Sequence, residues 1–241
     1  MITDGSTAQG KPCGVFYREG HLADSEKLDR EVLEIWSKTL GPEHPNTLSL
    51  KANIADTLLK EGHFREAERL QRETLATQIR LRGPEDLPSL VSQSDLAETL
   101  IREGRYAEAE ETARAAFQVQ LRKLGPLHPD TVATMRNLGR ALAYTNRYAE
   151  ASRLFRDAID KQEHSKGQGT PFSVWYSFAT IAVAANRPHD ALQYLQEAIH
   201  RGYKDADGLI ADDDLKSLRH NAEFLQLVAE LKGSSTRNKA P

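Results

Sequence analysis

The dominant feature of this chain is a motif that returns every 42 residues. The tripeptides at 41–43 (GPE), 83–85 (GPE) and 125–127 (GPL) stand 42 residues apart. The same step relates a turn residue, an aromatic residue and an alanine inside each unit (Gly62, Gly104 and Asn146; Phe64, Tyr106 and Tyr148; Ala67, Ala109 and Ala151). A period of this length is the signature of a stacked array, in which each unit buries its apolar face against its neighbours.

Each unit is predicted to contain two helices. In the unit 41–82, apolar residues at helical spacing follow Pro45, a residue that suits the first turn of a helix. Gly62 fits the left-handed position that ends a helix, and a second helix is expected from Phe64 to Gly83. Strand-like alternation is missing from all three units, so the sequence predicts an all-α solenoid of antiparallel helix pairs.

The edges of the array differ from its middle. A fourth unit is expected because residues 186–191 match 146–151 at a step of 40, with Trp175 in its core. At the start of the chain, residues 20–22 match 62–64, which indicates an earlier unit. Glycines and a proline at 5–14 would break its first helix. We therefore expect the exposed end of this unit to be completed by another chain or by the rest of a longer protein. Four segments result: an irregular N-terminal segment with a remnant helix (1–19), the array (20–203), capping helices (204–232) and a disordered tail (233–241).

Three stretches carry a resemblance to a known family. Residues 53–70 (NIADTLLKEGHFREAERL), 95–113 (DLAETLIREGRYAEAEETA) and 137–154 (NLGRALAYTNRYAEASRL) resemble the tetratricopeptide repeat, and the 42-residue step resembles the long variant of kinesin light chains. This resemblance implies a right-handed superhelix with a C-terminal helical cap. It also implies a scaffold that binds proteins or peptides. The segment after Tyr203 is similar to the end of bacterial repeat proteins, which favours a regulatory or targeting module of a bacterial-type signalling system.

Composition argues against several functions. The net charge of −3 provides no basic field for nucleic acid. The single cysteine, Cys13, excludes an internal disulfide and fits a cytoplasmic protein, and neither a signal peptide nor a membrane span is recognisable. The chain lacks the common hydrolase, phosphate-loop and dinucleotide motifs. We therefore expect no enzymatic activity, no cofactor, no nucleic-acid partner and no membrane partner.

Two patterns bear comparison with metal sites. His44 and His128 recur in the loop between units, each before a proline, and are expected to serve loop structure rather than to bind metal. Asp205, Asp207 and Asp214 have spacings similar to a calcium loop, but a tyrosine stands at its first position. A helix-capping acidic loop is the favoured interpretation.

The candidate binding surface is the groove lined by the first helices. If Ala55, Ala97 and Gly139 pack inward, helix geometry turns residues two positions before and one position after them toward this groove. Amide side chains there would bind an extended peptide backbone, a role that the family resemblance supports. Lys60, Arg102 and Tyr144 lie one turn further along, and Arg136 is next to Asn137. The predicted groove residues are therefore Asn53, Asp56, Lys60, Asp95, Glu98, Arg102, Arg136, Asn137, Arg140 and Tyr144. A solvated face without a ligand is the alternative interpretation for each of them.

Charge divides this predicted groove into two parts. Carboxylates gather in the first two units, whereas Arg136 and Arg140 make the later part basic, so we expect a ligand with basic groups at one end and an acidic group at the other. The leading hypothesis is a scaffold that holds a protein or extended peptide. The alternative is a homo-oligomerising module of a larger signalling protein, which would self-associate through the N-terminal hairpin and an apolar flank of Leu28, Val32 and Trp36.

Overall fold

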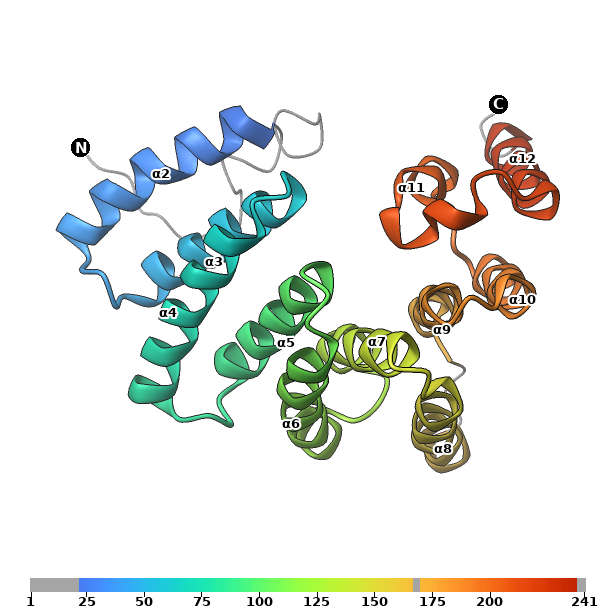
Figure 1. Ribbon diagram of the computed structural model, residues 1–241, viewed down its shortest axis with the longest axis horizontal. Coiled ribbons are helices and arrows are strands. Elements are labelled where there is room, and N and C mark those ends of the chain that lie inside the picture. Colours follow the sequence, from blue (N-terminus) through green and yellow to red (C-terminus); the bar gives the residue numbers. More distant parts are fainter. Residues whose placement is uncertain (1–21, 167–169, 238–241) are drawn as a thin grey trace. The chain divides into compact units, whose positions relative to one another are not determined.

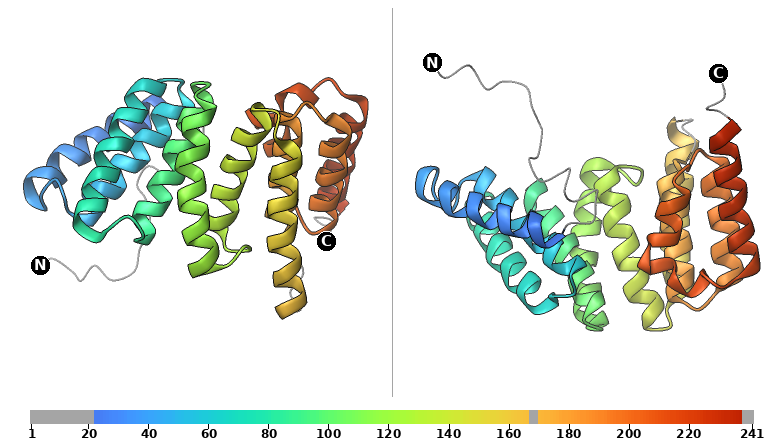
Figure 2. Two further views of the ribbon diagram at one scale, coloured as in Figure 1. Left: turned by 60° about the horizontal axis from the view of Figure 1, so that its bottom comes forward. Right: turned by 90° about the horizontal axis from the view of Figure 1, so that it is seen from above.

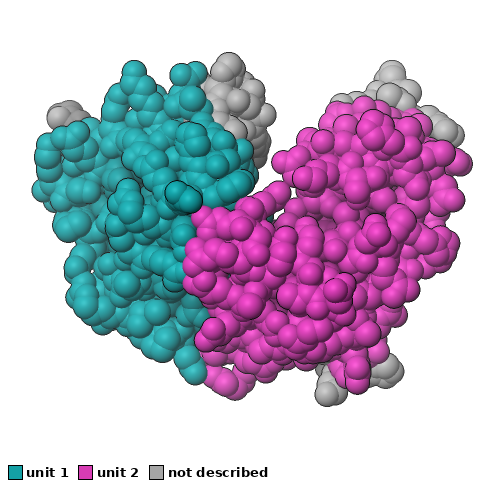
Figure 3. Space-filling model, viewed as in Figure 1, with its two compact units in different colours: residues 1–99 teal, residues 100–241 magenta. Residues whose placement is uncertain are grey.

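The fold is an all-α helical repeat solenoid, as predicted. The structure is a computed structural model that describes residues 22–166 and 170–237, and the predicted irregular segment 1–19 lies outside these residues. Every regular element within the described ranges is a helix (Figures 1 and 2). The chain divides into two compact units, residues 1–99 and 100–241 (Figure 3), which are described separately below.

Unit 1 contains α2 (Leu22–Thr39), α3 (Pro45–Lys60), α4 (Phe64–Arg82) and most of α5 (Leu87–Arg102). Helix α2 is the second helix of the earlier hairpin that the sequence indicates. The core of this unit joins Leu50, Ile54 and Leu58 of α3 to Ala67 of α4, and Val32 and Trp36 of α2 pack against it. Both of these residues of the predicted apolar flank are thus half-buried, and their role in self-association stays a prediction. Leu28 alone of the three is largely exposed, at 40%.

Unit 2 contains the last turn of α5 and all later helices. They are α6 (Tyr106–Leu124), α7 (Pro129–Tyr144), α8 (Tyr148–Lys166), α9 (Phe172–Ala184), α10 (Pro188–His200), α11 (Ala206–Ala211), the 3₁₀ helix η1 (Asp213–Leu218) and α12 (Ala222–Arg237). The shortened fourth hairpin is α9 with α10, which contact each other. Helix α12 extends to Arg237, five residues into the segment predicted to be disordered, and 238–241 lie outside the described residues.

The last three helical segments cover the end of the fourth hairpin. Leu209, Leu215, Phe224 and Leu231, from α11, η1 and α12, are buried in one cluster with residues of α9 and α10. Figure 1 shows α12 beside α10, and the two helices contact each other. A terminal solenoid unit needs such a cover because its apolar face would otherwise meet water.

Left-handed residues close the first helix of four hairpins. Gly62, Gly104, Asn146 and Asn186 have φ values of 83°, 77°, 61° and 54°. At each turn the following residue donates a backbone hydrogen bond into the last turn of the helix, as from His63 to Leu58 at 2.8 Å. Glycine and asparagine are the residues that adopt this conformation at least cost. The recurrence of these positions, at steps of 42, 42 and 40 residues, therefore has a backbone cause.

The two loop histidines are helix caps, which confirms their assignment to loop structure. The Nδ1 atom of His44 accepts a hydrogen bond from the backbone N–H of Asn46 at 3.2 Å, and Nδ1 of His128 accepts one from Asp130 at the same distance. Both histidines stand before a proline that begins a helix, α3 or α7. The cap satisfies a backbone donor that the first helical turn leaves without an intrahelical partner.

Small side chains occupy the helix seams, as the spacing predicts. Ala67, Ala109 and Ala151 are fully buried. Unit 2 also contains a ladder of aromatic rings: Phe155 of α8 meets Phe117 of α6 and Phe178 of α9 edge to face, at centroid distances of 5.6 and 6.5 Å. Trp175, which the sequence assigns to the core, packs against Phe178 and Tyr194.

Among the residues that the structure describes, no helix is both long enough and apolar enough to cross a membrane.

Candidate functional site

The three small residues expected to anchor the groove are buried. Ala55 and Ala97 are fully buried, and Gly139 lies inside α7 against α8 and α9. A Cβ atom added to Gly139 would lie 2.4 Å from Cδ1 of Ile181 and 2.8 Å from Cε2 of Phe155. Close packing of these three residues therefore fixes which face of each first helix is buried. The predicted polar residues are placed relative to that buried face.

The predicted site residues divide equally between the two units. Asn53, Asp56, Lys60, Asp95 and Glu98 belong to unit 1, and Arg102, Arg136, Asn137, Arg140 and Tyr144 belong to unit 2. Each group is considered in its own unit. Their use as a peptide-binding surface stays a prediction.

Unit 1 presents an acid-rich polar face on α3 and α5. Asp56, Lys60 and Asp95 are exposed, while Asn53 and Glu98 are half-buried. Nζ of Lys60 lies 3.3 Å from Oδ2 of Asp56. Partial burial lowers the pKa of the Lys60 ammonium, and the negative charge of Glu98 opposes this shift. This face therefore combines three carboxylates with one ammonium group.

Unit 2 does not present its predicted residues in the same way. Asn137 and Arg140 are each 2% exposed, so the expectation that both line an open groove is wrong. Tyr144 is exposed and stacks on Tyr106, with ring centroids 4.5 Å apart. Helix α7, which carries these residues, contacts α6, α8 and α9.

An acidic side chain from the C-terminal cap contacts the buried arginine. Nη2 of Arg140 lies 2.7 Å from Oδ1 of Asp214 in η1, and Nη2 of Arg102 lies 3.2 Å from the same oxygen atom. Burial raises the pKa of the Asp214 carboxyl, and Arg140 and Arg102 act in the opposite direction. Sequence reasoning missed this contact because it treated Asp214 only as a member of the acidic loop.

The segment that carries Asp214 is anchored on both sides. Asp212 caps η1 by accepting a hydrogen bond from the Asp214 N–H at 2.8 Å, and it also accepts one from the Tyr176 hydroxyl of α9. Burial and the Asp212 charge raise the pKa of Tyr176, and burial raises the pKa of Tyr203, which stacks on it, to about 12. Both hydroxyls therefore stay protonated at neutral pH.

The acidic loop itself caps a helix, as the sequence favours. Asp205 stands before α11, and its Oδ1 accepts a hydrogen bond from the Gly208 N–H at 2.8 Å. Among the described residues, no group of three or more His, Cys, Asp or Glu side chains has an arrangement that could hold a metal ion.

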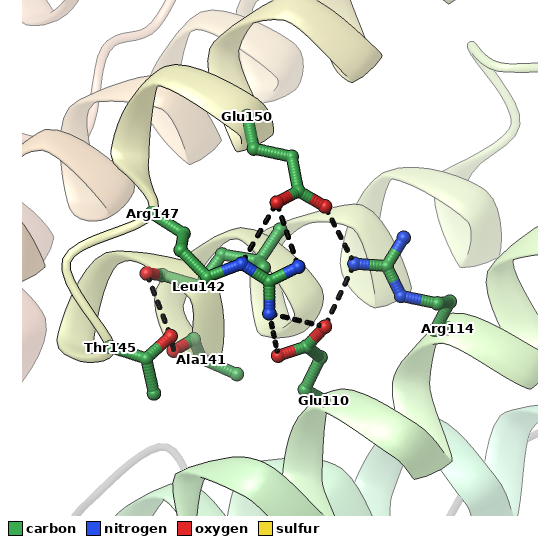
Figure 4. Close-up of polar contacts among 7 residues, drawn as sticks. All are labelled: Glu110, Arg114, Ala141, Leu142, Thr145, Arg147 and Glu150. Atoms are coloured by element: carbon green, nitrogen blue, oxygen red, sulfur yellow. Dashed lines mark hydrogen bonds and ion pairs between the residues drawn. The ribbon is translucent and has the colours of Figure 1, made fainter.

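Three residues of the second helices of unit 2, together with Arg147 just before α8, form a ring of charges that sequence reasoning did not identify. Arg114 bridges Glu110 at 2.8 Å and Glu150 at 3.0 Å, and Arg147 bridges the same two carboxylates at 2.8 and 2.7 Å (Figure 4). The ring joins α6 to α8. An analogous pair in unit 1 joins Arg30 to Glu66 at 2.7 Å. Arg30 and Glu66 are 36 residues apart, as are Arg114 and Glu150, and this shared spacing could have indicated the pairs from the sequence. Exposed pairs contribute little singly, and more as a network.

Comparisons with known proteins identify relatives of the chain. The model of the family described as tetratricopeptide repeat matches residues 13–80 and 89–163, which is more than half of the chain. The model of the A/B hydrolase-like, N-terminal domain matches residues 131–239, a smaller share. No curated protein matches.

Solved structures show the same fold at low sequence identity. One is a kinesin light chain from Podosopora anserina whose own TPR-like repeats are nearly identical to one another. It is 23% identical to this chain, with a TM-score of 0.64, and the match covers 78% of this chain and 90% of the other. A form of the same protein with one substitution gives a TM-score of 0.65. BtubC (BKLC) from P. vanneervenii is 17% identical, with a TM-score of 0.59 and coverage of 79% of both chains. Repeats of this kind typically form non-catalytic scaffolds for protein interaction. The chain belongs to the tetratricopeptide repeat family.

Proposed function

We propose that this protein is a non-catalytic scaffold that binds a protein or an extended peptide segment in the cytoplasm. The observation that carries the proposal is the polar face of unit 1, where α3 and α5 present exposed carboxylates above a fully buried row of small residues. A rigid surface of this kind loses little entropy when it binds a partner. Family membership supports the proposal because tetratricopeptide repeats generally mediate protein–protein interactions.

The chemistry of the unit 1 face favours a basic segment in the partner. Asp56, Asp95 and Glu98 supply three negative charges against the single positive charge of Lys60. Lys or Arg side chains of a partner would form charge-assisted hydrogen bonds with these carboxylates. Asn53 is on α3, three residues before Asp56, and its amide offers a donor and an acceptor to a peptide backbone.

The arginines of unit 2 favour an acidic group. Arg102, Arg136 and Arg140 all act on the carboxylate of Asp214, so three positive charges gather around this position, against the one negative charge of Asp212. We propose that the role of the predicted residues in this unit is to hold a carboxylate, with Tyr144 and Asn137 at its margin. A bacterial-type signalling context remains part of the proposal.

Neutralising the unit 1 face tests the proposed function. The variant Asp56→Asn, Asp95→Asn, Glu98→Gln keeps the size of the three side chains and removes their charges. We expect its affinity for a protein captured from the native organism's lysate to fall about tenfold at low salt, because exposed charge pairs contribute up to about 1 kcal/mol each. Titration of the purified partner at about 50 and 300 mM salt measures the loss, which should shrink at the higher salt.

A matched control removes the same number of charges elsewhere in unit 1. Glu31, Glu34 and Glu73 lie on α2 and α4, outside the proposed face, and each is replaced by Gln in the control variant. This variant should bind as the wild type does. Equal affinities of all three proteins for the captured partner would contradict the assignment of the face.

Self-association is a second candidate function, favoured by one observation. Leu28 and Ile35, seven residues apart on one face of α2, are 40% and 58% exposed. A second copy would bury them, and Ile35→Lys should then shift the protein toward the monomer. Sedimentation over a hundredfold range of concentration measures the mass, with Lys38→Ala as a control on the same helix. A constant monomer mass for the wild type would refute this function.

A further inference from the structure

Two arginines of unit 2 converge on one oxygen atom. Nη2 of Arg140 and Nη2 of Arg102 lie 2.7 and 3.2 Å from Oδ1 of Asp214, and the Asp214 side chain is only 7% exposed. The guanidinium groups come from α7 and from the end of α5, whereas the carboxylate comes from the C-terminal cap. The arrangement is that of a carboxylate held in a binding site, with the protein itself supplying the carboxylate.

The Arg140 guanidinium has more donors than this contact uses. Its side chain is 2% exposed, and its Nε and Nη1 atoms have no hydrogen-bond partner among the described residues. An arginine fork normally binds a carboxylate through two parallel hydrogen bonds, and a buried donor without an acceptor is costly. Asp214 therefore occupies the place of a bound carboxylate but leaves two of the Arg140 nitrogen atoms without an acceptor.

Burial of Asp214 adds a second sign that the contact is imperfect. The pKa of this carboxyl is raised: loss of solvent is the largest cause and the charge of Asp212 adds to it, while Arg140 and Arg102 act in the opposite direction. A carboxylate that met both edges of the Arg140 guanidinium would use donors that Asp214 leaves without a partner. The site is thus better suited to a carboxylate that approaches freely than to one tethered on η1.

We propose that Arg140 and Arg102 form a carboxylate-binding site of unit 2, and that Asp214 is a resident ligand that masks it. The inference rests on the proposed scaffold function, and it names the chemistry of one subsite: an acidic side chain or chain terminus of the partner. In the masked state η1 occupies the place that such a group would take. Access requires η1 to move, which would uncover Leu215, a fully buried residue of the cap.

Chemical rescue by a small anion tests the site without knowledge of the partner. Asp214→Ala in the full chain removes the carboxylate and leaves a space of the size of formate. We expect sodium formate, at constant ionic strength set with sodium chloride, to raise the Tm of this variant in a saturable way, by roughly 3–6 °C at ten times its Kd. Wild type should show little change, because its own carboxylate fills the position.

Two further variants identify the residues that respond. Asp214→Asn keeps the site filled with a side chain of the same size and should show no formate effect. Asp214→Ala combined with Arg102→Gln should lose most of the rescue. If Asp214→Ala is unfolded in chloride, recovery of its helical circular dichroism on addition of formate replaces the Tm shift as the readout.

The outcomes separate this inference from the proposed function. No difference between the formate responses of Asp214→Ala and wild type would overturn the masked site, as would equal effects of formate and chloride. Neither result depends on a partner, so the unit 1 binding assay reports on the scaffold function independently. If the neutralised unit 1 variant loses partner binding but formate does not rescue Asp214→Ala, the protein is a scaffold that lacks this carboxylate site.

Discussion

Replacing Phe155 by Ala is expected to lower the free energy of unfolding of unit 2 by about 3–5 kcal/mol. Phe155 is fully buried, and its ring stands edge to face between Phe117 and Phe178. Removing it takes the middle ring from a ladder that joins α6, α8 and α9, and leaves a cavity that three packed helices have little freedom to close. Urea denaturation followed by circular dichroism measures the change.

An exposed phenylalanine in the same unit provides the control. Phe172 begins α9, is 40% exposed, and contacts Tyr203 through one ring edge. Phe172→Ala should cost less than about 1.5 kcal/mol, which is the upper range for an aromatic pair beyond its buried area. Equal losses for the two variants would show that the ring ladder is not the centre of this core.

Replacing Gly139 by Ala should lower stability by about 1–3 kcal/mol, although the same change in an exposed helix raises it by up to about 1 kcal/mol. The added methyl group would lie 2.4 Å from Cδ1 of Ile181 and 2.8 Å from a ring carbon of Phe155. Because these neighbours are buried, relief requires a shift of α9 or α8 against α7. The denaturation midpoint in urea should therefore fall.

A second glycine gives the matched comparison for this substitution. Gly233 lies in α12, and a Cβ atom there would meet nothing within 4 Å. Gly233→Ala should be neutral or slightly stabilising. In the double variant Gly139→Ala with Ile181→Val, which deletes Cδ1, the loss should be smaller than the sum of the two single losses. Strict additivity would argue against a clash at this position.

The repeat and its turns were predictable because they follow from local backbone requirements. Gly62 and Asn146 occupy left-handed positions, and the 42-residue spacing alone marks both as turn residues. The buried alanines are predictable in the same way, since only a small side chain fits where two helices approach closely. His44 and His128 were assigned correctly to the loops, and the structure adds that they cap α3 and α7.

The burial of the unit 2 site was not predictable from the helix that carries it. The pattern within α7 places Arg140 on the same side as the predicted groove, and that inference assumes that water covers this side. Arg140 instead contacts Asp214, which comes from a cap with no counterpart in the repeat. A long-range contact made by a non-repeating segment leaves no periodic signal, so only the folded chain reveals it.

The ring of charges on the second helices illustrates an intermediate case. One pair of the ring, Arg114 with Glu150, has the same 36-residue spacing as Arg30 with Glu66, so part of the pattern exists in the sequence. The choice of partners across helices depends on the angle between α6 and α8, which periodicity does not supply. Exposed charged residues have many potential partners, and the pairing emerges only with the geometry.

The recurring hairpin closures affect how such an array changes during evolution. Each 42-residue segment begins at a glycine with positive φ and contains its own left-handed turn, so both of its ends have the same backbone geometry as the ends of its neighbours. Unequal recombination that duplicates or deletes one such segment would join matching junctions. The gene could thus gain or lose repeats in single steps, while the unrepeated C-terminal helices would have to be inherited intact.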